Sequence, residues 1–263
     1  MRFSKYHGCQ NDFIVILDEE MTPAVARQLC DRHAGIGADG VALVTLSPGL
    51  APPRMQIINA DGSQPEMCGN ALRCVVKHLV DNALVDEDEE VHVITDAGLL
   101  SARTEMDKDG RVKMVTVDMG PPREPVQAKM CNVVGRPLRG HTVSMGNPHF
   151  VIESPLPMRD AQSIGQQVST HLDFPEGTNA SFVHVLDKNR CEAVVFERGA
   201  GLTMACGTGA CAIVAVGQQK GWFGSDPVEV QLPGGRLTIT RFPDGHLHMR
   251  GAAVWVFDGE CET

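Results

Sequence analysis

The chain has 263 residues, of which 43% are hydrophobic, and a formal net charge of −10. A chain of this length can bury a large core in one large domain or in two of ordinary size. It has no run of about 18 apolar residues and its N-terminus lacks the apolar core of a signal peptide, so a soluble, cytoplasmic protein without membrane partners is expected. Lysine and arginine are scattered singly, which argues against a nucleic-acid partner because phosphate binding needs a basic patch.

The nine cysteines fit neither a disulfide framework nor a metal site. Their number is odd and no export signal accompanies them, so reduced thiols are expected. No two cysteines lie three residues apart, the spacing that structural zinc sites usually show. We therefore expect no metal.

In the first half of the chain, turn residues and apolar runs predict two helices among several strands. Thr22 before Pro23 predicts the start of a helix that continues to residue 32 or 33, with Gly35 ending it. After Cys68, apolar residues recur at the spacing of a helix packed on one face, at Leu72, Val75, Val76, Leu79 and Val80. Strands are predicted at residues 13–17, 41–45, 55–58, 91–95, 99–104 and 112–118.

Residues 119–122 contain a glycine and two prolines and predict a crossover to a second half, which repeats the same order. A helix is predicted at residues 158–171. The helix after Cys206 is apolar all round over residues 210–216, which is typical of a helix enclosed by a sheet. Strands are predicted at residues 150–153, 181–186, 192–196, 228–241 and 247–257.

The two halves also share short motifs. Cys68 and Cys206, which lie 138 residues apart (206 − 68), each stand directly before a small, polar, helix-opening turn. A weaker correspondence relates the surroundings of Asn11 and Asn147 at nearly the same separation. An internal duplication explains these matches. The predicted halves are residues 1–118 and residues 119–251.

Each of the two cysteines is placed where a helix start can activate it. Unpaired backbone N–H groups and the helix dipole should lower the thiol pKa below its usual value of about 8.5, and they can also hold a carboxylate. A thiolate on one face of an α-carbon and a thiol on the other could move its proton, if amide donors stabilise the carboxylate as it becomes an enediolate. This chemistry requires no cofactor. The candidate amide donors are those of Gly69, Asn70, Gly207 and Thr208.

Further motifs accompany the two cysteines along the whole chain. They are His7-Gly8, Asn11-Asp12-Phe13, Asn59-Ala60-Asp61-Gly62-Ser63, Glu66-Met67-Cys68-Gly69-Asn70, Arg73-Cys74, Gly146-Asn147-Pro148-His149-Phe150, Gly177-Thr178-Asn179, Glu197-Arg198-Gly199-Ala200-Gly201 and Ala205-Cys206-Gly207-Thr208-Gly209-Ala210. In this order they resemble the diaminopimelate epimerase family. The resemblance implies an α/β (α+β) fold of two pseudo-symmetric halves, each a mixed, barrel-like β-sheet around a central helix. It also implies that the last strand, within residues 252–263, returns to the first half.

The resemblance implies an isomerase that interconverts LL- and meso-diaminopimelate in lysine and peptidoglycan-precursor biosynthesis. Family members use no pyridoxal phosphate or other cofactor and are often homodimers. By the same resemblance, Cys68 and Cys206 are the thiolate base and thiol acid, and His149 and Glu197 assist beside the reacting centre. The residues implied in binding the distal end of the substrate are Asn11, Asn59, Asn147, Asn179 and Arg198.

Two departures from the family pattern leave the substrate preference open. Cys9 and Gln10 stand where an apolar or small residue and then glycine are usual, and Leu202 replaces a residue that is more often polar. One alternative is a cofactor-independent racemase of proline, hydroxyproline, histidine or glutamate, although Asn70 and residues 197–201 argue against the proline enzymes. A more distant alternative is a redox switch, since two facing thiols of low pKa can form a disulfide.

Overall fold

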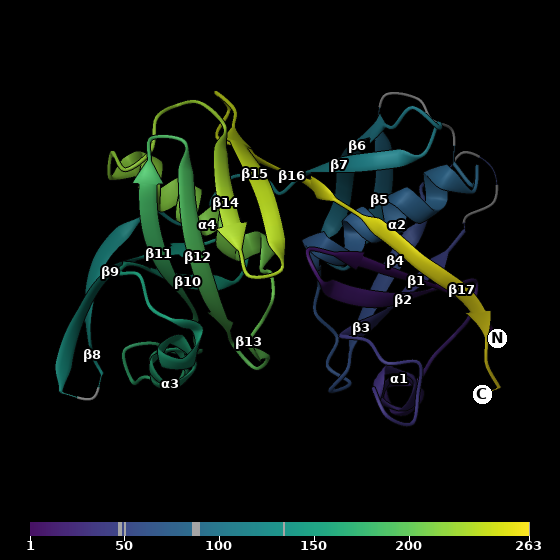
Figure 1. Ribbon diagram of the computed structural model, residues 1–263, viewed down its shortest axis with the longest axis horizontal. Helices are drawn as coiled ribbons and strands as arrows, with labels where there is room; N and C mark the ends of the chain where they lie inside the picture. The colour runs from purple at the N-terminus through teal and green to yellow at the C-terminus, as the bar shows by residue number, and fades with distance from the viewer. Residues whose placement is uncertain (47–48, 50, 86–89, 134, 263) are drawn as a thin grey trace. The chain divides into compact units, whose positions relative to one another are not determined.

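The computed structural model describes residues 1–46, 49, 51–85, 90–133 and 135–262. These residues form two compact units, one made of residues 1–118 and 250–263 and the other of residues 119–249. Figure 1 labels the helices and strands of both. Within the described part of the chain, no helix is both long and apolar enough to span a membrane.

The first unit is a mixed β-sheet around helix α2 (Gly69–Asp81), with helix α1 (Pro23–Cys30) packed outside it against the third and fourth strands (Figure 1). Its strands are β1 (Arg2–Gly8), β2 (Asn11–Leu17), β3 (Gly40–Thr45), β4 (Arg54–Asn59), β5 (Val91–Thr95), β6 (Gly98–Met106), β7 (Val112–Asp118) and β17 (Val254–Glu260). They pair in the order β17, β1, β2, β3, β4, β5, β6, β7. The β2–β3 and β4–β5 pairs are parallel, and the other pairs are antiparallel.

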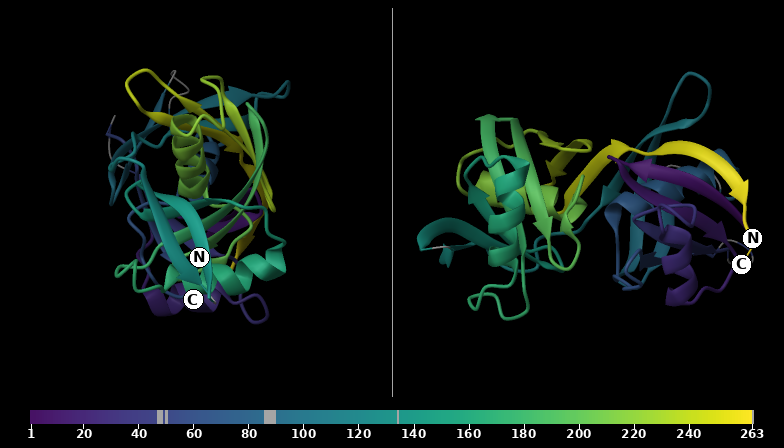
Figure 2. Two further views of the ribbon diagram at one scale, coloured as in Figure 1. Left: turned by 90° about the vertical axis from the view of Figure 1, so that its left-hand side faces the viewer. Right: turned by 60° about the horizontal axis from the view of Figure 1, so that its bottom comes forward.

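The second unit is a mixed sheet around helix α4 (Gly207–Gln219), with helix α3 (Met158–Ser169) packed against β11 and β12 (Figure 2). Its strands are β8 (Gln127–Val133), β9 (Arg136–Ser144), β10 (Pro148–Glu153), β11 (Asn179–Asp187), β12 (Arg190–Glu197), β13 (Gly201–Leu202), β14 (Val228–Leu232) and β15 (Gly235–Arg241). They pair in the order β8, β9, β10, β11, β12, β14, β15, and β13 also pairs with β12. Strand β16 (Leu247–Ala252) spans the boundary between the units in the sequence.

The pairing pattern confirms the expected duplication. The parallel pairs β2–β3 and β4–β5 of the first unit correspond to β10–β11 and β12–β14 of the second, and one helix lies between the two strands of each pair in sequence. In the second unit β8 pairs with β9 at the edge, whereas in the first unit that place beside β1 is taken by the C-terminal strand β17. The fold is therefore a mixed α/β fold of two equivalent halves.

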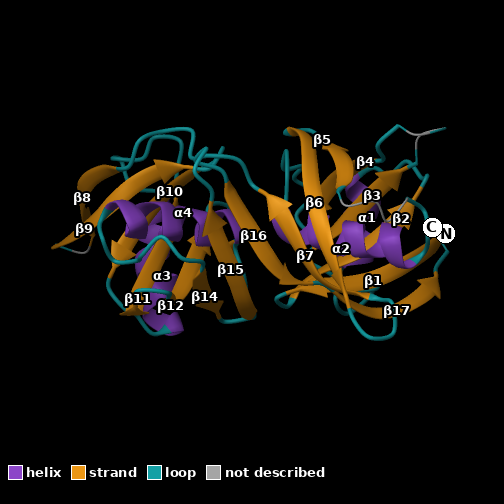
Figure 3. Cartoon of the chain, turned by 90° about the horizontal axis from the view of Figure 1, so that it is seen from above, coloured by secondary structure: helices purple, strands orange, loops and turns teal. Residues whose placement is uncertain are grey.

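The central helices are more enclosed than the sequence indicates for α2. Figure 3 shows strands surrounding the helix in each unit. In α2 every residue from position 69 to position 80 is buried, although the apolar stripe predicts burial of one face only. The buried polar side chains have partners that explain this: Lys77 pairs with Asp81 at 2.7 Å, and the hydroxyl of Tyr6 contacts Nδ1 of His78 at 3.2 Å. Internal pairing offsets the cost of removing such groups from water.

Helix α1 begins as predicted but ends earlier. The hydroxyl of Thr22 accepts a hydrogen bond from the N–H of Val25, at 3.4 Å. The helix ends at Cys30 because the carboxylate of Asp31 accepts hydrogen bonds from the two N–H groups at positions 33 and 34, at 2.7 and 2.8 Å. The last residues predicted to be helical therefore form a turn, which the side chain of Asp31 stabilises.

The turn between β1 and β2 adopts a conformation that its residues disfavour. Gly8 and Asn11 pair across the hairpin, and the two central residues, Cys9 and Gln10, have φ angles of 54° and 62°. Such two-residue turns prefer Asn-Gly because a side chain at positive φ is strained. We expect Gln10→Gly to raise the free energy of unfolding by about 0.5–1 kcal/mol, a value reduced by the greater flexibility of glycine in the unfolded chain. Urea denaturation measures this change, and a loss of stability would contradict it.

Candidate active site

Cys68 is the residue that caps the start of α2. Its backbone is extended (φ −136°, ψ 111°), and its carbonyl accepts the first intrahelical hydrogen bond, from Leu72 at 2.9 Å. The side chain of Cys68 is partly buried, whereas Gly69 and Asn70 of the first turn are buried. The N–H groups of a first helical turn have no partners within the helix, so the thiol lies at an anion-binding helix start.

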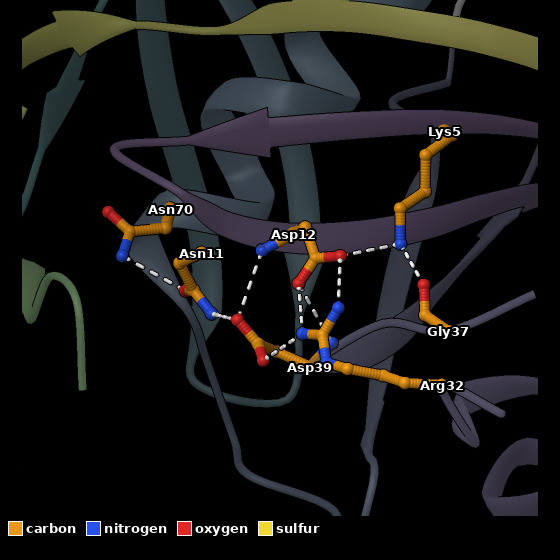
Figure 4. A network of polar contacts seen from close by, with 7 residues as sticks. All are labelled: Lys5, Asn11, Asp12, Arg32, Gly37, Asp39 and Asn70. Carbon is orange, nitrogen blue, oxygen red and sulfur yellow. Dashed lines mark hydrogen bonds and ion pairs between the residues drawn. The ribbon is translucent and has the colours of Figure 1, made fainter. Parts of the chain in front are cut away.

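Asn70, in the first turn of α2, forms a chain of amide contacts with the start of β2. Its Nδ2 donates to Oδ1 of Asn11 at 3.0 Å, and Nδ2 of Asn11 donates to Oδ2 of Asp39 at 2.7 Å (Figure 4). Because one end of the Asn11 amide accepts and the other donates, these two contacts determine which way the amide faces.

Asp39 belongs to a charged network that continues behind Asn11 (Figure 4). Arg32 donates to the carboxylates of Asp39 and Asp12 at 2.8 and 2.7 Å, and Lys5 pairs with Asp12 at 2.6 Å. Burial opposes the ionisation of Asp12, but the hydrogen bonds from Arg32 and Lys5 outweigh it and lower its pKa to about 2. Asp12 is therefore held as an anion between two cations, and Arg32 joins its carboxylate to that of Asp39.

Asn59 lies at the end of β4, opposite Gly40 of β3. Its Nδ2 donates to Oγ of Ser63 at 2.9 Å, and its carbonyl accepts from the N–H of Gly62 at 2.8 Å. Gly62 has φ +83°, which only glycine adopts without strain. These contacts of Asn59 stabilise the turn that precedes Cys68.

Cys206 occupies the corresponding position at the start of α4. Its sulfur accepts a hydrogen bond from the N–H of Gly209 at 3.3 Å, and Oγ1 of Thr208 lies 3.5 Å from it. Only 3% of Cys206 is exposed. A Cβ atom at Gly209 would lie 3.1 Å from the sulfur, so glycine is the residue that lets the helix N–H approach this closely.

A chain of polar contacts leads from β10 to the sulfur of Cys206. Nε2 of His149 lies 3.0 Å from Oδ1 of Asn147, and Nδ2 of Asn147 donates to Oγ1 of Thr208 at 3.2 Å. Since an amide oxygen only accepts, Nε2 of His149 carries the proton, and Thr208 is left free to donate its own proton to the sulfur. Burial, together with the charge of Arg198, lowers the pKa of His149 to about 3, so the ring is neutral.

Asn179 joins this chain to the end of β12. It is the first residue of β11, directly beside His149, and its Nδ2 lies 3.5 Å from Nε2 of that ring. Its Oδ1 accepts from the backbone N–H of Arg198 at 2.8 Å, while the Arg198 guanidinium donates to the carbonyl of Glu176 at 2.7 Å. The Arg198 side chain is thus anchored at one nitrogen on an exposed loop.

Glu197, the last residue of β12, contacts the cysteine itself. Its carboxylate accepts a hydrogen bond from the Cys206 thiol, and Oε1 accepts one from Oγ1 of Thr203 at 2.5 Å. Burial raises the pKa of Cys206 well above its ordinary value, and the charge of Glu197 raises it further. Hydrogen bonds from Thr208 and Gly209 lower it but are outweighed. The expectation of a lowered pKa is therefore wrong for Cys206.

Leu202, one of the two departures from the family pattern, lies on the other side of this segment. It pairs with Phe196 across β12 and β13, and its side chain packs against the core cluster that contains Phe196. Alternate residues of a strand face opposite sides, so Leu202 points away from the side that carries Glu197 and Thr203. Its apolar character is explained by this packing.

The described residues include one cluster that could offer ligands to a metal ion: Cys131, His171 and Asp173. Nε2 of His171 lies 3.0 Å from the carbonyl of Asn132, and its Nδ1 accepts from the N–H of Asp173 at 3.1 Å. Both ring nitrogens thus have backbone partners, one on β8 and one in the loop after α3, and Cys131 is fully buried with its pKa raised by desolvation. Hydrogen bonding explains this cluster without an ion.

Comparison with known proteins places the chain among close relatives. Residues 3–124 and 141–256 match the family model of diaminopimelate epimerase. A diaminopimelate epimerase of Pelotomaculum thermopropionicum is 43% identical, over 99% of this chain and 98% of the relative, and one of Moorella thermoacetica is 41% identical, over 99% of each. A probable proline racemase of Agrobacterium radiobacter K84 has the same fold, with a TM-score of 0.76 at 14% identity, over 99% of this chain and 92% of that one.

Proposed function

Because the chain belongs to the diaminopimelate epimerase family, we propose that it interconverts LL- and meso-diaminopimelate for lysine and peptidoglycan precursors in the cytoplasm. The family makes the protein an isomerase that acts on a small molecule. The observation that carries the proposal is identity above 40% over nearly the full length of relatives that bear this name. The polar residues gathered around each helix-capping cysteine support it.

In the proposed mechanism, Cys68 and Cys206 act on opposite faces of one α-carbon. A thiolate removes the α-proton, the electron pair of the C–H bond moves toward the carboxylate, and the other thiol gives a proton to the opposite face. Its sulfur becomes the new thiolate, so charge and protons balance. Supporting this, each cysteine caps a buried helix whose first N–H groups suit a carboxylate and its enediolate form. The proposed donors are the amides of Gly69, Asn70, Gly207 and Thr208.

We assign Glu197 the role of proton acceptor for Cys206. With its raised pKa, Cys206 rests as a thiol, and it acts as a base only once its proton has moved to the carboxylate that already accepts its hydrogen bond. The resulting thiolate would be stabilised by Thr208 and Gly209. His149 is buried and neutral, and we assign it the positioning of Asn147, and through it of Thr208.

The distal end of diaminopimelate carries an amino acid group, and we propose that amides and a guanidinium bind it. These are the side chains of Asn11, Asn59, Asn147, Asn179 and Arg198. Of these side chains Asn179 is buried, the other three amides are half-buried and Arg198 is exposed. A substrate without the distal group would lose the hydrogen bonds proposed here, at a cost of about 0.5–1.5 kcal/mol each. This cost would disfavour shorter amino acids such as proline.

Asp39 is expected to affect substrate binding indirectly, by holding the amide of Asn11 in place. In Asp39→Ala the Asn11 amide loses its charged acceptor and can turn over, so we expect KM to rise about tenfold or more while kcat changes little. Asp96→Ala is the control, because Asp96 pairs with Arg54 in the same unit without contact to Asn11. Steady-state kinetics of both variants measure the effect. A lower kcat with unchanged KM in Asp39→Ala would show that Asn11 does not serve binding.

The proposed activity is tested by α-proton exchange in heavy water under reducing conditions. The substrates are LL- and meso-diaminopimelate beside proline, hydroxyproline, glutamate and histidine. Exchange and interconversion of the diaminopimelates alone would support the proposal. Exchange on another amino acid alone would indicate a racemase on the same scaffold, and reversible disulfide formation without any exchange would indicate a redox switch.

We also propose a homodimer in which a second copy covers β17. This strand pairs with β1 along one side, and four successive apolar residues, at positions 254–257, are between 41% and 50% exposed. An apolar strand left uncovered would favour aggregation. We expect sedimentation velocity to find a dimer, and Trp255→Lys to convert it to monomer. A monomeric wild-type protein would contradict the proposal.

A further inference from the structure

We propose that Thr203 is a positioning residue of the active site, which holds the Glu197 carboxylate in the orientation that receives the proton of Cys206. This inference rests on the proposed role of Cys206 in proton transfer. No motif that marks the family resemblance includes Thr203.

A tight hairpin brings Thr203 back to Glu197. Gly201 pairs with Glu197 across β12 and β13, and Gly199 and Gly201 have φ angles of 84° and 80°, which let the chain reverse within a few residues. The N–H of Thr203 donates to the carbonyl of Val195 at 3.5 Å, which continues the pairing by one step. Thr203 is thus a diagonal neighbour of Glu197 on the same face of the hairpin.

The contact between the two side chains is short and directional. Oγ1 of Thr203 lies 2.5 Å from Oε1 of Glu197, the separation of a hydroxyl that donates to a charged carboxylate. The thiol of Cys206 donates to the same carboxylate. With two donors the Glu197 carboxylate has little freedom to rotate, and Glu197 and Thr203 are both partly buried, which limits competition from water.

The hydroxyl should influence both the rate and its pH dependence. A donor to the ionised Glu197 carboxylate stabilises the ionised form. Loss of the Thr203 hydroxyl should therefore move the acidic limb of the activity profile, where Glu197 must be ionised, to higher pH. The Thr203 hydroxyl also weakens the effect of the Glu197 charge on the sulfur of Cys206. When the hydroxyl is removed, the thiol of Cys206 therefore becomes harder to ionise. A hydroxyl that served only to stabilise the hairpin would change the stability of the fold and neither of these properties.

The test compares Thr203→Val, which keeps the shape and removes the hydroxyl, with Thr203→Ser, which keeps the hydroxyl. Thr142→Val is the control, since its hydroxyl makes only a 3.5 Å contact with a backbone carbonyl of the neighbouring strand. We expect Thr203→Val to lower kcat about tenfold to a hundredfold with KM nearly unchanged, the size of a lost hydrogen bond to a charged group. Its acidic limb should move to higher pH. Thr203→Ser should recover most of the rate.

Three results would overturn the inference. The first is a Thr203→Val variant that thermal melting shows to be folded and that keeps the wild-type kcat and pH profile. The second is a Thr203→Ser variant as impaired as the valine variant, because the hydroxyl would then not be the cause. A rise in KM at unchanged kcat would likewise assign Thr203 to the shape of the hairpin.

A second measurement keeps this inference separate from the proposed function. Iodoacetamide labelling across pH, quantified for each cysteine by mass spectrometry, reports the ionisation of Cys206 without any substrate. The midpoint for Cys206 should move to higher pH in Thr203→Val, while that for Cys68, in the other unit, serves as internal reference and stays unchanged. A wild-type protein that leaves diaminopimelate untouched would refute the proposed function alone, whereas an unmoved Cys206 midpoint would refute the role of Thr203.

Discussion

Cys206→Ala and Cys68→Ala are each expected to lower the interconversion of LL- and meso-diaminopimelate by more than about a thousandfold, because members of one catalytic set fail together when either is removed. In the proposed mechanism every turnover needs a base on one face of the α-carbon and an acid on the other. Alanine supplies neither. The measurement is the rate of interconversion in both directions, with α-proton exchange followed in the same samples.

Buried cysteines on the same helices provide matched controls. Cys74 lies on α2 and Cys211 on α4, both fully buried, and burial raises the pKa of Cys74 to about 12. Their alanine variants should lose stability by about 1 kcal/mol through the smaller side chain and retain nearly full activity. Near-normal turnover in either Cys68→Ala or Cys206→Ala would contradict the two-thiol mechanism. Equal losses in the control variants would show that disturbed helix packing, and not thiol chemistry, caused the effect.

The sequence predicts those helices and strands whose buried side chains are all apolar. Helix α4 follows from its uninterrupted apolar run, and the strands beside it follow from theirs. Strand β1 was not predicted, because Ser4 and Lys5 interrupt its apolar residues. Lys5 is nevertheless buried, since Asp12 of the neighbouring strand pairs with it at 2.6 Å. A pairing of this kind between strands cannot be recognised in the sequence of either strand alone.

Strands β8 and β9 were missed for a different reason. Most residues of β8 are exposed, and only Cys131 and Val133 face the core. Pairing between the two strands, and between β9 and β10, maintains this hairpin rather than a run of apolar side chains. A sequence pattern of alternating hydrophobicity does not detect strands of this kind.

Motif order supplies the candidate residues of the proposed site, but it does not supply their electrostatics. Within each unit, candidate residues lie at strand ends and helix starts, and some contact one another, such as Asn11 with Asn70 and Asn147 with Thr208, although the motifs do not predict these contacts. The sequence around Cys206 reveals only the N–H groups of the helix start, which lower a thiol pKa. Burial and the carboxylate of Glu197, which depend on tertiary packing, reverse the direction of its pKa shift.

The supporting residues were not identified from sequence at all. Asp39 and Arg32 lie apart from the motifs and reach Asn11 only through folding. Thr203 does follow a motif, and its position two residues after Gly201, which pairs with Glu197, is a weak signal that it faces Glu197. Such residues act through others, so their importance depends on geometry that a motif does not encode.

Glu197→Gln is expected to lower kcat by about a hundredfold or more, because the proposed acceptor of the Cys206 proton is replaced by a neutral amide of similar shape. The direction in which the pH profile shifts provides a further test. Burial makes the largest contribution to the raised pKa of Cys206, and the charge of Glu197 makes the next. Removing the charge therefore lowers this pKa toward its ordinary value, although burial keeps it raised. The basic limb of activity, where Cys206 must be a thiol, should move to lower pH.

Glu192→Gln is the control, since Glu192 lies exposed on the same strand and pairs with His184. Cysteine-specific labelling should show the Cys206 midpoint moving to lower pH in Glu197→Gln and to higher pH in Thr203→Val. The opposite signs are informative, because a general loosening of the site would expose the sulfur and move both midpoints in the same direction. Glu197→Gln with a wild-type kcat, or with its basic limb at higher pH, would remove Glu197 from the proton path and leave Cys206 to exchange its proton directly with substrate or solvent.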